Sequence, residues 1–397
     1  MKFEGFDCAT LRTKLILLDP KSVFGECIKP HTKKKIFYVS QYVDNWLYVV
    51  DNVSSDIYFL DVMCNAGIYQ NGSLSSSIEV LNIFIKHAQV HPSNTYHLCC
   101  NDFDSSKVAT MLLIKKIYED ELKKDEISNI QIEIESLDAS EYINQCAKKF
   151  SSTFGSCPLK RSILLYVDPY NFISFNLAKA TYLFCKTVYC EVLLNYYFND
   201  FIRNRQNSKC PQKGEAIKKV IEDFCLMEFD SDPKEVMRAF IKELTTTKLK
   251  YYYYFEMQNS TRNTLYFLIY LTPNLRGLEK IKDSTNKVFG YHNFYCVSDH
   301  IDEEWINLFG ESRLDTALIG AREDFQNSMV QSGRSKITFE EMEIMLLEGS
   351  FIKKTQIIDH IIKPLIASGF LKKAGKTNPR NFTEDEYEII NNNENYK

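Results

Sequence analysis

The sequence predicts an α/β protein built on one doubly wound, mostly parallel β-sheet of about seven strands, followed by a smaller C-terminal domain. Five short apolar segments alternate with helical patterns in the first half of the chain, which is typical of parallel sheets with helices on both faces. Two further apolar segments, residues 250–256 and 264–271, follow each other closely, as expected for an antiparallel pair. After about residue 326 the pattern changes to two amphipathic helices and a basic turn.

The length and charge of the chain set the expected domain organisation. A chain of 397 residues exceeds one ordinary domain, so we expect an N-terminal extension at residues 1–30, a main domain at residues 31–325 and a C-terminal domain at residues 326–397. Its 45% hydrophobic and 25% charged residues are ordinary for a soluble globular protein. The net charge of −4 excludes a uniformly basic surface, so contact with nucleic acid would need a local patch.

Membrane and metal signals are missing from the sequence. No window is long enough to span a bilayer, and residues 1–15 lack the apolar core of a signal peptide, so we expect a cytoplasmic protein that does not contact a membrane. Twelve cysteines occur, but none in a Cys-x-x-Cys pair and none at a Cys-His spacing typical of metal sites. We therefore predict buried free thiols, and neither disulfides nor a bound metal.

The predicted elements follow one another regularly along the main domain. Residues 1–30 show no clear pattern, whereas apolar residues at three- and four-residue steps predict a helix from about residue 31 to residue 50. The fourth predicted strand is an unbroken apolar run, as expected at the centre of a parallel sheet. The five strands are predicted at residues 57–60, 96–100, 130–134, 163–167 and 191–195, with helices between them at residues 73–88, 108–122 and 140–149 and from residue 175.

The first strand and its turn organise the chain. This strand ends in Asp61 and is followed by a turn containing Asn65, Ala66 and Gly67, and then by a helix. An apolar strand, an acid, a tight turn and a helix in this order are typical of the first βα unit of a Rossmann-like nucleotide-binding sheet. Asn and Gly tolerate the positive φ that such a turn requires. An ordinary strand–turn–helix remains the alternative for this segment alone.

Four successive strands end in an acid or in a turn that contains one: Asp61, Asp102 or Asp104, Asp138, and Asp168. Ligands of doubly wound sheets bind at the carboxyl ends of the strands, so these acids are expected to converge on one crevice. The hydroxyls of a ribose suit Asp102, and the amino group of adenine suits Asp138. A single acid at a strand end is usually a turn former. Four in succession favour a cofactor of the S-adenosylmethionine (SAM) type.

The fourth strand is followed by Asp168-Pro-Tyr-Asn171, and the antiparallel pair completes the sheet arrangement of class I SAM-dependent methyltransferases. This tetrapeptide resembles the Asp/Asn/Ser-Pro-Pro-Tyr/Phe loop of amino-methyltransferases, which holds the target amine and stacks an aromatic ring on a flipped base. The resemblance implies that Asp168, Pro169 and Tyr170 bind the methyl acceptor. Methyl transfer from a sulfonium mainly needs a positioned, desolvated nucleophile, which an acceptor group and an aromatic platform provide. A turn imposed by Pro169 is the alternative.

The C-terminal domain combines a winged-helix pattern with positive charge. Amphipathic helices at residues 337–347 and 355–367, a strand from residue 370, a basic turn and a return at residues 381–382 predict a winged helix-turn-helix. Between residues 352 and 380, seven Lys and Arg residues oppose one Asp, a balance of 7 − 1 = +6. Phosphate contact is the favoured interpretation, and a solvated face of a protein-docking domain is the alternative. The predicted nucleic-acid-binding residues are Lys353, Lys354, Lys372, Lys373, Lys376 and Arg380.

Several motifs together resemble the three-Cys-motif partner protein family, which is named for the protein encoded beside it. The resemblance covers roughly residues 31–290 and, more loosely, the C-terminal domain. Two departures stand out, because Asn65 replaces the first glycine of the family's Gly-x-Gly turn and Asn171 replaces the glycine after its Asp-Pro-Phe. The matching motifs are His31-Thr-x-Lys34 with Tyr42 and Trp46, Leu60 to Tyr69 with Gly72, Asn101 to Asp104, Tyr166 to Asn171, Val192 to Asn195, and Leu268 to Thr272 with Gly277.

The resemblance implies a methyltransferase-like Rossmann domain that acts in phage defence and has a protein partner encoded nearby. We therefore expect a SAM-dependent methyltransferase acting on an amino group of a nucleic acid, with Asp61, Asn65 and Gly67 in the cofactor turn, Asp102 on ribose and Asp138 on adenine. Asn65 favours an alternative, a catalytically degenerate scaffold or sensor that binds a partner protein or nucleic acid. A nuclease is disfavoured because no Asp/Glu-x-Lys motif accompanies the acids.

Overall fold

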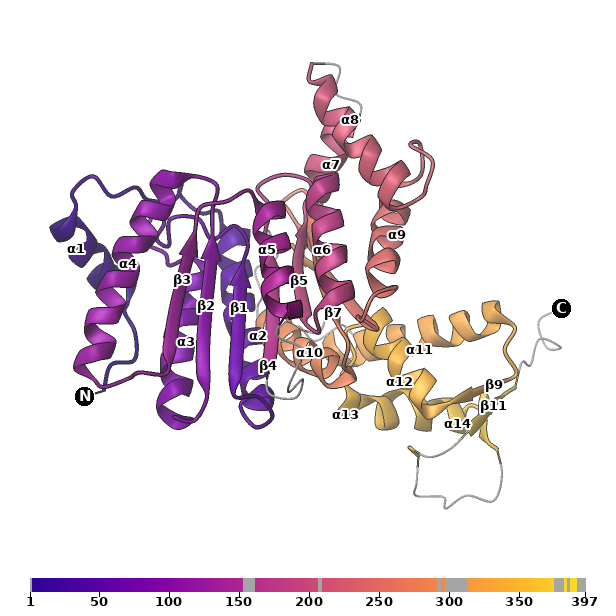
Figure 1. Ribbon diagram of the computed structural model, residues 1–397. Helices are drawn as coiled ribbons and strands as arrows, with labels where there is room; N and C mark the ends of the chain where they lie inside the picture. Colours follow the sequence, from indigo (N-terminus) through magenta and orange to yellow (C-terminus); the bar gives the residue numbers. More distant parts are fainter. Residues whose placement is uncertain are drawn as a thin grey trace.

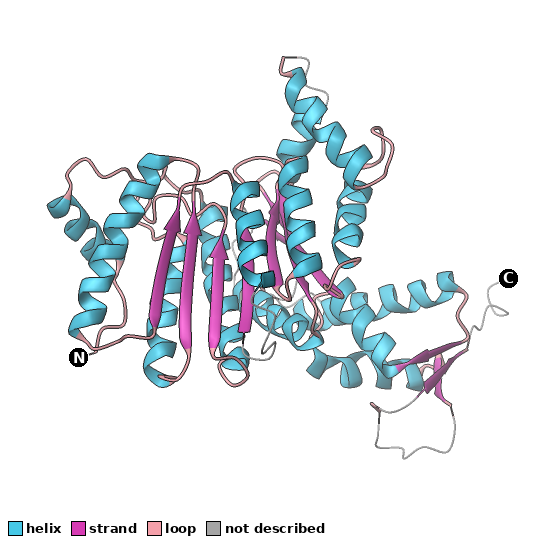
Figure 2. Ribbon diagram, in the orientation of Figure 1, coloured by secondary structure: helices cyan, strands magenta, loops and turns pink. Residues whose placement is uncertain are grey.

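An eight-stranded β-sheet forms the centre of the protein in the computed structural model, which describes residues 2–152, 161–205, 209–290, 294–296, 313–374, 382–383 and 386–390. Its strands are β1 (Asp56–Asp61), β2 (Thr95–Asn101), β3 (Ile130–Glu135), β4 (Arg161–Val167), β5 (Glu191–Tyr196), β6 (Tyr251–Gln258), β7 (Thr264–Thr272) and β8 (Phe294–Cys296). The strand order is β3-β2-β1-β4-β5-β7-β6-β8. Strands β1 to β5 run parallel, and the arrows of this part of the sheet point the same way in Figure 2. Strand β7 is antiparallel to β5 and β6, and β8 is parallel to β6.

Helices cover both faces of this sheet, so the main domain is layered as helix, sheet and helix (Figure 1). One face carries α2 (Pro30–Val50), α3 (Ser76–Val90), α4 (Ser105–Lys124) and α10 (Leu275–Phe289). The other face carries α5 (Ala139–Ser152), α6 (Phe175–Thr187) and α9 (Pro233–Thr245). Between β5 and α9 the chain forms α7 (Phe198–Arg205), α8 (Pro211–Lys219) and the π-helical turn η2 (Val220–Phe224), which extend beyond the carboxyl edge of the sheet in Figure 1.

The predicted α/β sheet is confirmed in its main features. All five parallel strands and the antiparallel pair occur, and their order, with β7 between β5 and β6, is that of Rossmann-like class I methyltransferase folds. The predicted strand bounds differ from the observed bounds by at most two residues. Strand β8 was not predicted, because a segment of three residues has no periodicity of its own and forms by pairing with the edge of β6.

The N-terminal extension is ordered, which the sequence did not predict. It contains α1 (Cys8–Leu18), whose N-cap Asp7 accepts a hydrogen bond from the backbone N–H of Thr10. Only Leu11 and Leu15 of this helix are buried, a stripe too short to show as periodicity. Helix α1 lies against α4. Further along, the backbone N–H of Gly25 donates to the carbonyl of Ile68 at 2.8 Å, so the extension also reaches the turn after β1.

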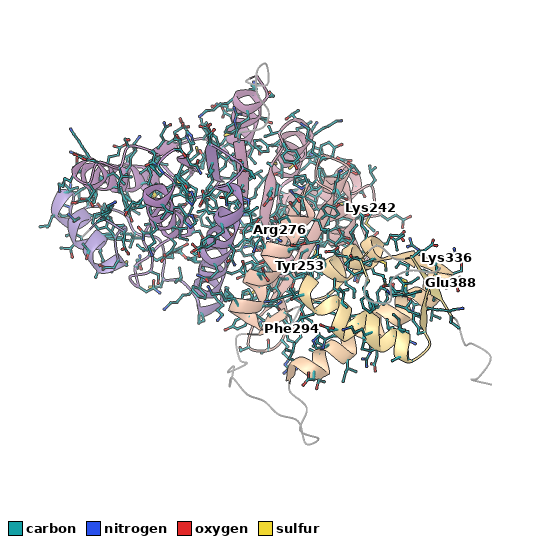
Figure 3. The ribbon with its side chains drawn as sticks, turned by 90° about the horizontal axis from the view of Figure 1, so that it is seen from below. Lys242, Tyr253, Arg276, Phe294, Lys336 and Glu388 are labelled. Carbon is teal, nitrogen blue, oxygen red and sulfur yellow. The ribbon has the colours of Figure 1, made fainter. Side chains whose placement is uncertain are left out.

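The C-terminal region contains helices and a small antiparallel sheet of order β10-β11-β9. Figure 3 shows Lys336 and Glu388 close together, in agreement with their pairing on β9 and β11. Two details of the prediction are wrong: the helix expected from residue 337 begins at Phe339, and the strand that pairs with β10 is not at residues 381–382 but further on, in β11. The elements are α11 (Arg313–Ser332), β9 (Lys336–Thr338), α12 (Phe339–Gly349), α13 (Lys354–Gln356), η3 (Ile357–Ile362), α14 (Lys363–Ala367), β10 (Leu371–Lys373) and β11 (Glu386–Ile389).

The first of these differences has a local cause. Residues of β9 pair with β11, which holds Thr338 in an extended conformation. The Thr338 side chain then accepts from the backbone N–H of Glu341, whose carboxylate accepts from the backbone N–H of Thr338. This capping box starts α12 one residue after the strand.

The C-terminal region packs on α10 and β6 of the main domain. Asn286 Nδ2 donates to the carbonyl of Phe351 at 3.2 Å. Lys282 is fully buried, with its Nζ 3.5 Å from the ring centroid of Tyr253 and donating to the carbonyl of Ser350. Burial holds the pKa of Lys282 well below its usual range. One hydrophobic core continues from the sheet into this region, so the two parts share buried surface.

The cysteines and the helices of the described residues bear on two expectations from the composition. The cysteines whose side chains are described are free, and most of them are buried. No described helix combines the length and the apolar character needed to cross a bilayer.

Candidate functional site

A cavity of about 550 Å³ lies at the carboxyl edge of the sheet, next to β1 and β4. Strand β1 is flanked by β2 on one side and β4 on the other, so the order of the sheet reverses here. This switch point is where doubly wound sheets bind ligands. Three segments that are distant in sequence line the cavity: residues 24–35, the turn after β1, and the loop after β4.

The structure brings together five of the eight residues predicted for cofactor and acceptor binding. Asp61, Asn65, Asp168, Pro169 and Tyr170 line the cavity. The remaining three do not line it: Gly67, Asp102 and Asp138.

Asp61 is the buried acid at the end of β1. Its side chain is 2% exposed, and its oxygens accept hydrogen bonds from Ser77 Oγ at 2.5 Å and from the backbone N–H of Met63 at 3.2 Å. Burial raises the pKa of Asp61 to about 7, and the hydrogen bond from Ser77 opposes this rise. The group can therefore hold or release a proton near neutral pH at the cavity wall.

In the turn after β1, the backbone N–H groups of Asn65 and Ala66 are hydrogen-bonded to side chains of the protein. Asn65 adopts a φ of +59°, as predicted for this position. Its backbone N–H donates to Asp102 Oδ2 at 3.0 Å, and its side-chain Oδ1 accepts from the backbone N–H of Ala66 at 2.8 Å. The other oxygen of Asp102 accepts from the backbone N–H of Asp104 at 3.0 Å. Asp102 is therefore buried and hydrogen-bonded within the protein, whereas the sequence predicted that it contacts a ribose.

Gly67 and Asp138 have local structural roles, in helix packing and in helix capping. A Cβ at Gly67, whose φ is +79°, would lie 2.5 Å from Cδ1 of Ile114, so the glycine allows α4 to pack closely on the turn. Asp138 is exposed after β3, and its Oδ1 accepts from the backbone N–H of Ser140 at 2.9 Å and of Glu141 at 3.3 Å. This is the hydrogen-bonding pattern of a helix cap.

Asp168 is held by a buried lysine that the sequence analysis missed. Lys35 Nζ lies 2.7 Å and 2.5 Å from the two carboxylate oxygens, and the Lys35 side chain is 3% exposed. Asn195 Nδ2 donates to Asp168 Oδ1 at 2.7 Å, and Tyr166 OH donates to Oδ2 at 3.1 Å. Burial alone would lower the pKa of Lys35, but the charge of Asp168 outweighs it and holds that pKa well above its usual range.

A sequence signal for Lys35 existed. Val39 and Tyr42 are both buried on α2, and Lys35 precedes them by four and seven residues on the same face. A lysine inside an apolar helical stripe needs a buried acid as partner.

Tyr170 forms the exposed rim of the cavity. Its side chain is 53% exposed, and its hydroxyl accepts from Lys107 Nζ at 2.7 Å. The same Nζ lies 4.4 Å from the ring centroid, within the range of a cation–π contact. An aromatic ring with a neighbouring cation is a suitable platform for a flat, anionic ligand.

The six predicted nucleic-acid-binding residues are not gathered in one described patch. Lys353 Nζ lies 3.6 Å from Asp283, and Lys354 Nζ lies 3.0 Å from Glu279, so both side chains face α10. Lys372 and Lys373 lie instead on β10, where Lys373 Nζ is 4.2 Å from the ring centroid of Phe382. Lys376 and Arg380 lie outside the described residues.

Comparison with known proteins gives distant structural similarities only. No family model and no curated protein matches the chain. A Legionella pneumophila protein of known structure shares 9% identity at a TM-score of 0.37, covering 65% of this chain and 93% of that one. A Listeria monocytogenes protein described as a class I SAM-dependent methyltransferase shares 10% identity at a TM-score of 0.29, covering 69% and 71%. A Burkholderia thailandensis O-methyltransferase family protein shares 11% identity at a TM-score of 0.27, covering 66% and 58%.

These similarities carry no argument about cofactor, substrate or family. The class of the protein follows from its own strand order, which is that of a methyltransferase-like α/β fold. Membership of the three-Cys-motif partner family stays a prediction from the sequence motifs.

Proposed function

We propose that the protein binds SAM in the cavity at the carboxyl edge and acts as a SAM-dependent methyltransferase on a nucleic acid. The observation that carries the proposal is that the Asp61 turn and the Asp168-Pro-Tyr loop line one hollow at the switch point of the sheet. Its volume of about 550 Å³ falls in the usual range of small-molecule sites, about 300–1,000 Å³.

In this proposal the residues of the cavity position the reactants. Asp61 and the Asn65 turn would hold the methionine part of the cofactor, and Tyr170 provides a ring at the rim on which a base can stack. Asp168 would orient the acceptor amine. SAM supplies the activated methyl group, and the protein holds the nucleophile in line and away from water.

The hydrogen bonds that Asp168 already accepts favour a second candidate function, that of a catalytically degenerate scaffold or sensor. A carboxylate has about four lone-pair sites, and Lys35 on both oxygens, Asn195 and Tyr166 occupy that number. A target amine would have to replace one of these donors. Asp102 is likewise occupied by the turn, as described above. A protein of this kind would bind a ligand or partner without transferring a methyl group.

We further propose that the C-terminal region binds the nucleic acid. Helix α12, the helical stretch from α13 to α14 and the sheet β10-β11-β9 are consistent with a winged helix-turn-helix. Lys353 and Lys354 form ion pairs with acids on α10, which favours a role in docking the C-terminal region on the sheet domain. Of the described residues, Lys372 and Lys373 on β10 are therefore the better candidates for phosphate contact. A role in phage defence beside a neighbouring protein rests on the family resemblance alone.

Titration calorimetry of the full chain with SAM tests the cofactor. We expect binding at micromolar concentration. Met63→Trp, which fills the cavity wall, should abolish that binding, whereas Asp138→Asn, at the exposed cap of α5, should leave it unchanged. Absence of heat with folded wild-type protein contradicts the proposal. Binding without transfer of a labelled methyl group to DNA or RNA would support the scaffold.

A further inference from the structure

A second polar cluster lies at the amino edge of the sheet, the end opposite to the cavity. Asp51 follows the last residue of α2, His87 lies in the last turn of α3, and His91 follows α3 directly. Asp51 Oδ2 is 2.6 Å from His87 Nδ1 and 3.6 Å from His91 Nε2. The three ligand atoms lie within 4.8 Å of one another. Three groups that bind metals readily therefore meet at one point.

Two of the remaining polar atoms of the cluster, one on His87 and one on Asp51, are held in place by a second layer of contacts. His87 Nε2 lies 3.2 Å from Asp44 Oδ1, which leaves Nδ1 directed at Asp51. Tyr96 OH donates to Asp51 Oδ1 at 2.7 Å. In metalloproteins a carboxylate on the far ring nitrogen of a histidine orients the ring and raises its basicity. The surroundings of this cluster match that pattern.

The backbone also favours a cation at this place. Both α2 and α3 end at the cluster, where Asp51 and His91 are their C-caps. Helix C-termini carry the negative end of the helix dipole and stabilise nearby positive charge. Two such ends, with the Asp51 carboxylate between the two imidazoles, provide an electrostatic site for a metal ion.

We propose that Asp51, His87 and His91 bind a divalent transition-metal ion, with Zn²⁺ the best match to one carboxylate and two imidazole ligands. Zinc takes ligands at about 2.0–2.2 Å in tetrahedral geometry, which places ligand atoms roughly 3.4 Å apart. The distances of 2.6 and 3.6 Å from Asp51 Oδ2 lie on either side of this value, so zinc binding would require His87 to move away from Asp51. The His91 side chain is 32% exposed, which leaves the fourth position open to water or to a partner's side chain.

The competing interpretation is an ion network without metal. In that network the His87 ring lies between two carboxylates, with Nε2 3.2 Å from Asp44 Oδ1 and Nδ1 2.6 Å from Asp51 Oδ2. The shorter distance is that of a hydrogen bond, so a proton lies between His87 and Asp51. Metal binding would displace this proton, so the two interpretations differ in whether zinc releases it.

The role of the metal would be to join the ends of α2 and α3, independently of the methyltransferase proposal. The cluster lies at the opposite end of β1 from the cavity and shares no residue with it. Loss of SAM binding would therefore leave the metal proposal standing, and loss of metal binding would leave the SAM proposal standing.

The experiment uses the full chain, stripped with a chelator and then titrated with Zn²⁺ in calorimetric buffers of different ionisation enthalpy. We expect one ion per chain at micromolar or lower concentration, a proton released on binding, and a higher thermal midpoint. With Co²⁺ in place of zinc, the visible absorption of a tetrahedral site should appear.

The deciding variant is His91→Gln, because His91 is the most exposed ligand and its loss should leave the fold intact. Zinc affinity should fall by at least about tenfold. The matched control is His360→Gln, an exposed histidine on η3, which should bind as the wild type does. Absence of stoichiometric zinc binding, or equal affinity of His91→Gln and wild type, overturns the proposal.

Discussion

The two edges of the parallel sheet carry polar clusters of different construction, although α2 contributes to both. At the carboxyl edge, Lys35 from the first turns of α2 meets Asp168 beside a hollow of about 550 Å³. At the amino edge, Asp51 at the end of α2 meets two histidines whose ligand atoms lie within 4.8 Å of it. The carboxyl edge offers room for a molecule, whereas the amino edge offers converging atoms and helix ends suited to an ion. The two ends of the sheet thus differ in the kind of ligand that they suit.

The largest effect is expected from breaking the carboxyl-edge ion pair. Asp168→Ala leaves the ammonium of Lys35 buried without a counter-charge, which should cost about 3–5 kcal/mol of unfolding free energy. The double variant Lys35→Met/Asp168→Asn removes both charges and should recover most of that loss. Urea denaturation of the three proteins measures this. Equal destabilisation of the single and double variants would show that the pair does not hold this edge together.

The proton on Asp61 should give the next effect. Because its pKa is raised in the folded protein, its stabilising contribution is complete below the unfolded pKa of about 3.8 and is lost as the pH rises towards 7. Asp61→Asn stays neutral, so relative to wild type it should gain about 2 kcal/mol between about pH 5 and about pH 7. Denaturation curves across that range provide the measurement. A difference that does not change with pH would mean that Asp61 is ionised throughout.

A smaller effect is expected from the hydrogen bond that Tyr96 donates to the amino-edge cluster. Tyr96→Phe removes the donor to Asp51 Oδ1 and should weaken zinc binding by about tenfold, or about 1.4 kcal/mol. Tyr48→Phe is the matched control, because the Tyr48 ring lies 5.2 Å from that of His87 and its side chain is largely exposed. Equal zinc affinities in the two variants would argue against metal ligation by Asp51.

The smallest effect concerns Asn65 at the carboxyl edge. Asn65→Gly relieves a positive φ but loses the acceptor for the Ala66 N–H, so stability should change by less than about 1 kcal/mol. The space freed beside the cavity should tighten SAM binding severalfold. Asn65→Ala, which keeps the strain and loses the hydrogen bond, should cost about 1 kcal/mol. Weaker SAM binding by the glycine variant would mean that the Asn65 side chain contacts the cofactor.

The two edges also differ in how far the sequence could predict them. The parallel strands were predictable because unbroken apolar runs such as residues 163–167 mark buried strands, and the rule for strand ends then indicated Asp61 and Asp168. The same rule indicated Asp102, whose carboxylate instead accepts from the Asn65 turn. Which way a side chain leaves a strand end depends on tertiary contacts that a pattern of residue types does not contain.

No comparable rule indicates from the sequence which side chains meet at the amino edge of the sheet. His87 and His91 are four residues apart at the end of one helix, which is a metal-binding spacing, but the third member, Asp51, comes from another helix. A pair of histidines does not match a Cys-His spacing, so the sequence did not predict this site. The sequence likewise did not predict that the C-terminal region docks on α10. Lys353 and Lys354 resemble phosphate-binding residues until their acidic partners on α10 are known.

That docking has a consequence for dissecting the protein into fragments. Lys282 lies entirely within the contact between α10 and the chain around Ser350. A truncated chain ending near residue 325 would open this amine and the surrounding apolar surface to water, where the lysine would take up a proton. Deletion of the last seventy or so residues would therefore change the folding of the remainder as well as remove the region proposed to bind nucleic acid. Point substitutions on β10 will therefore test the proposed nucleic-acid contact without the change in folding that truncation causes.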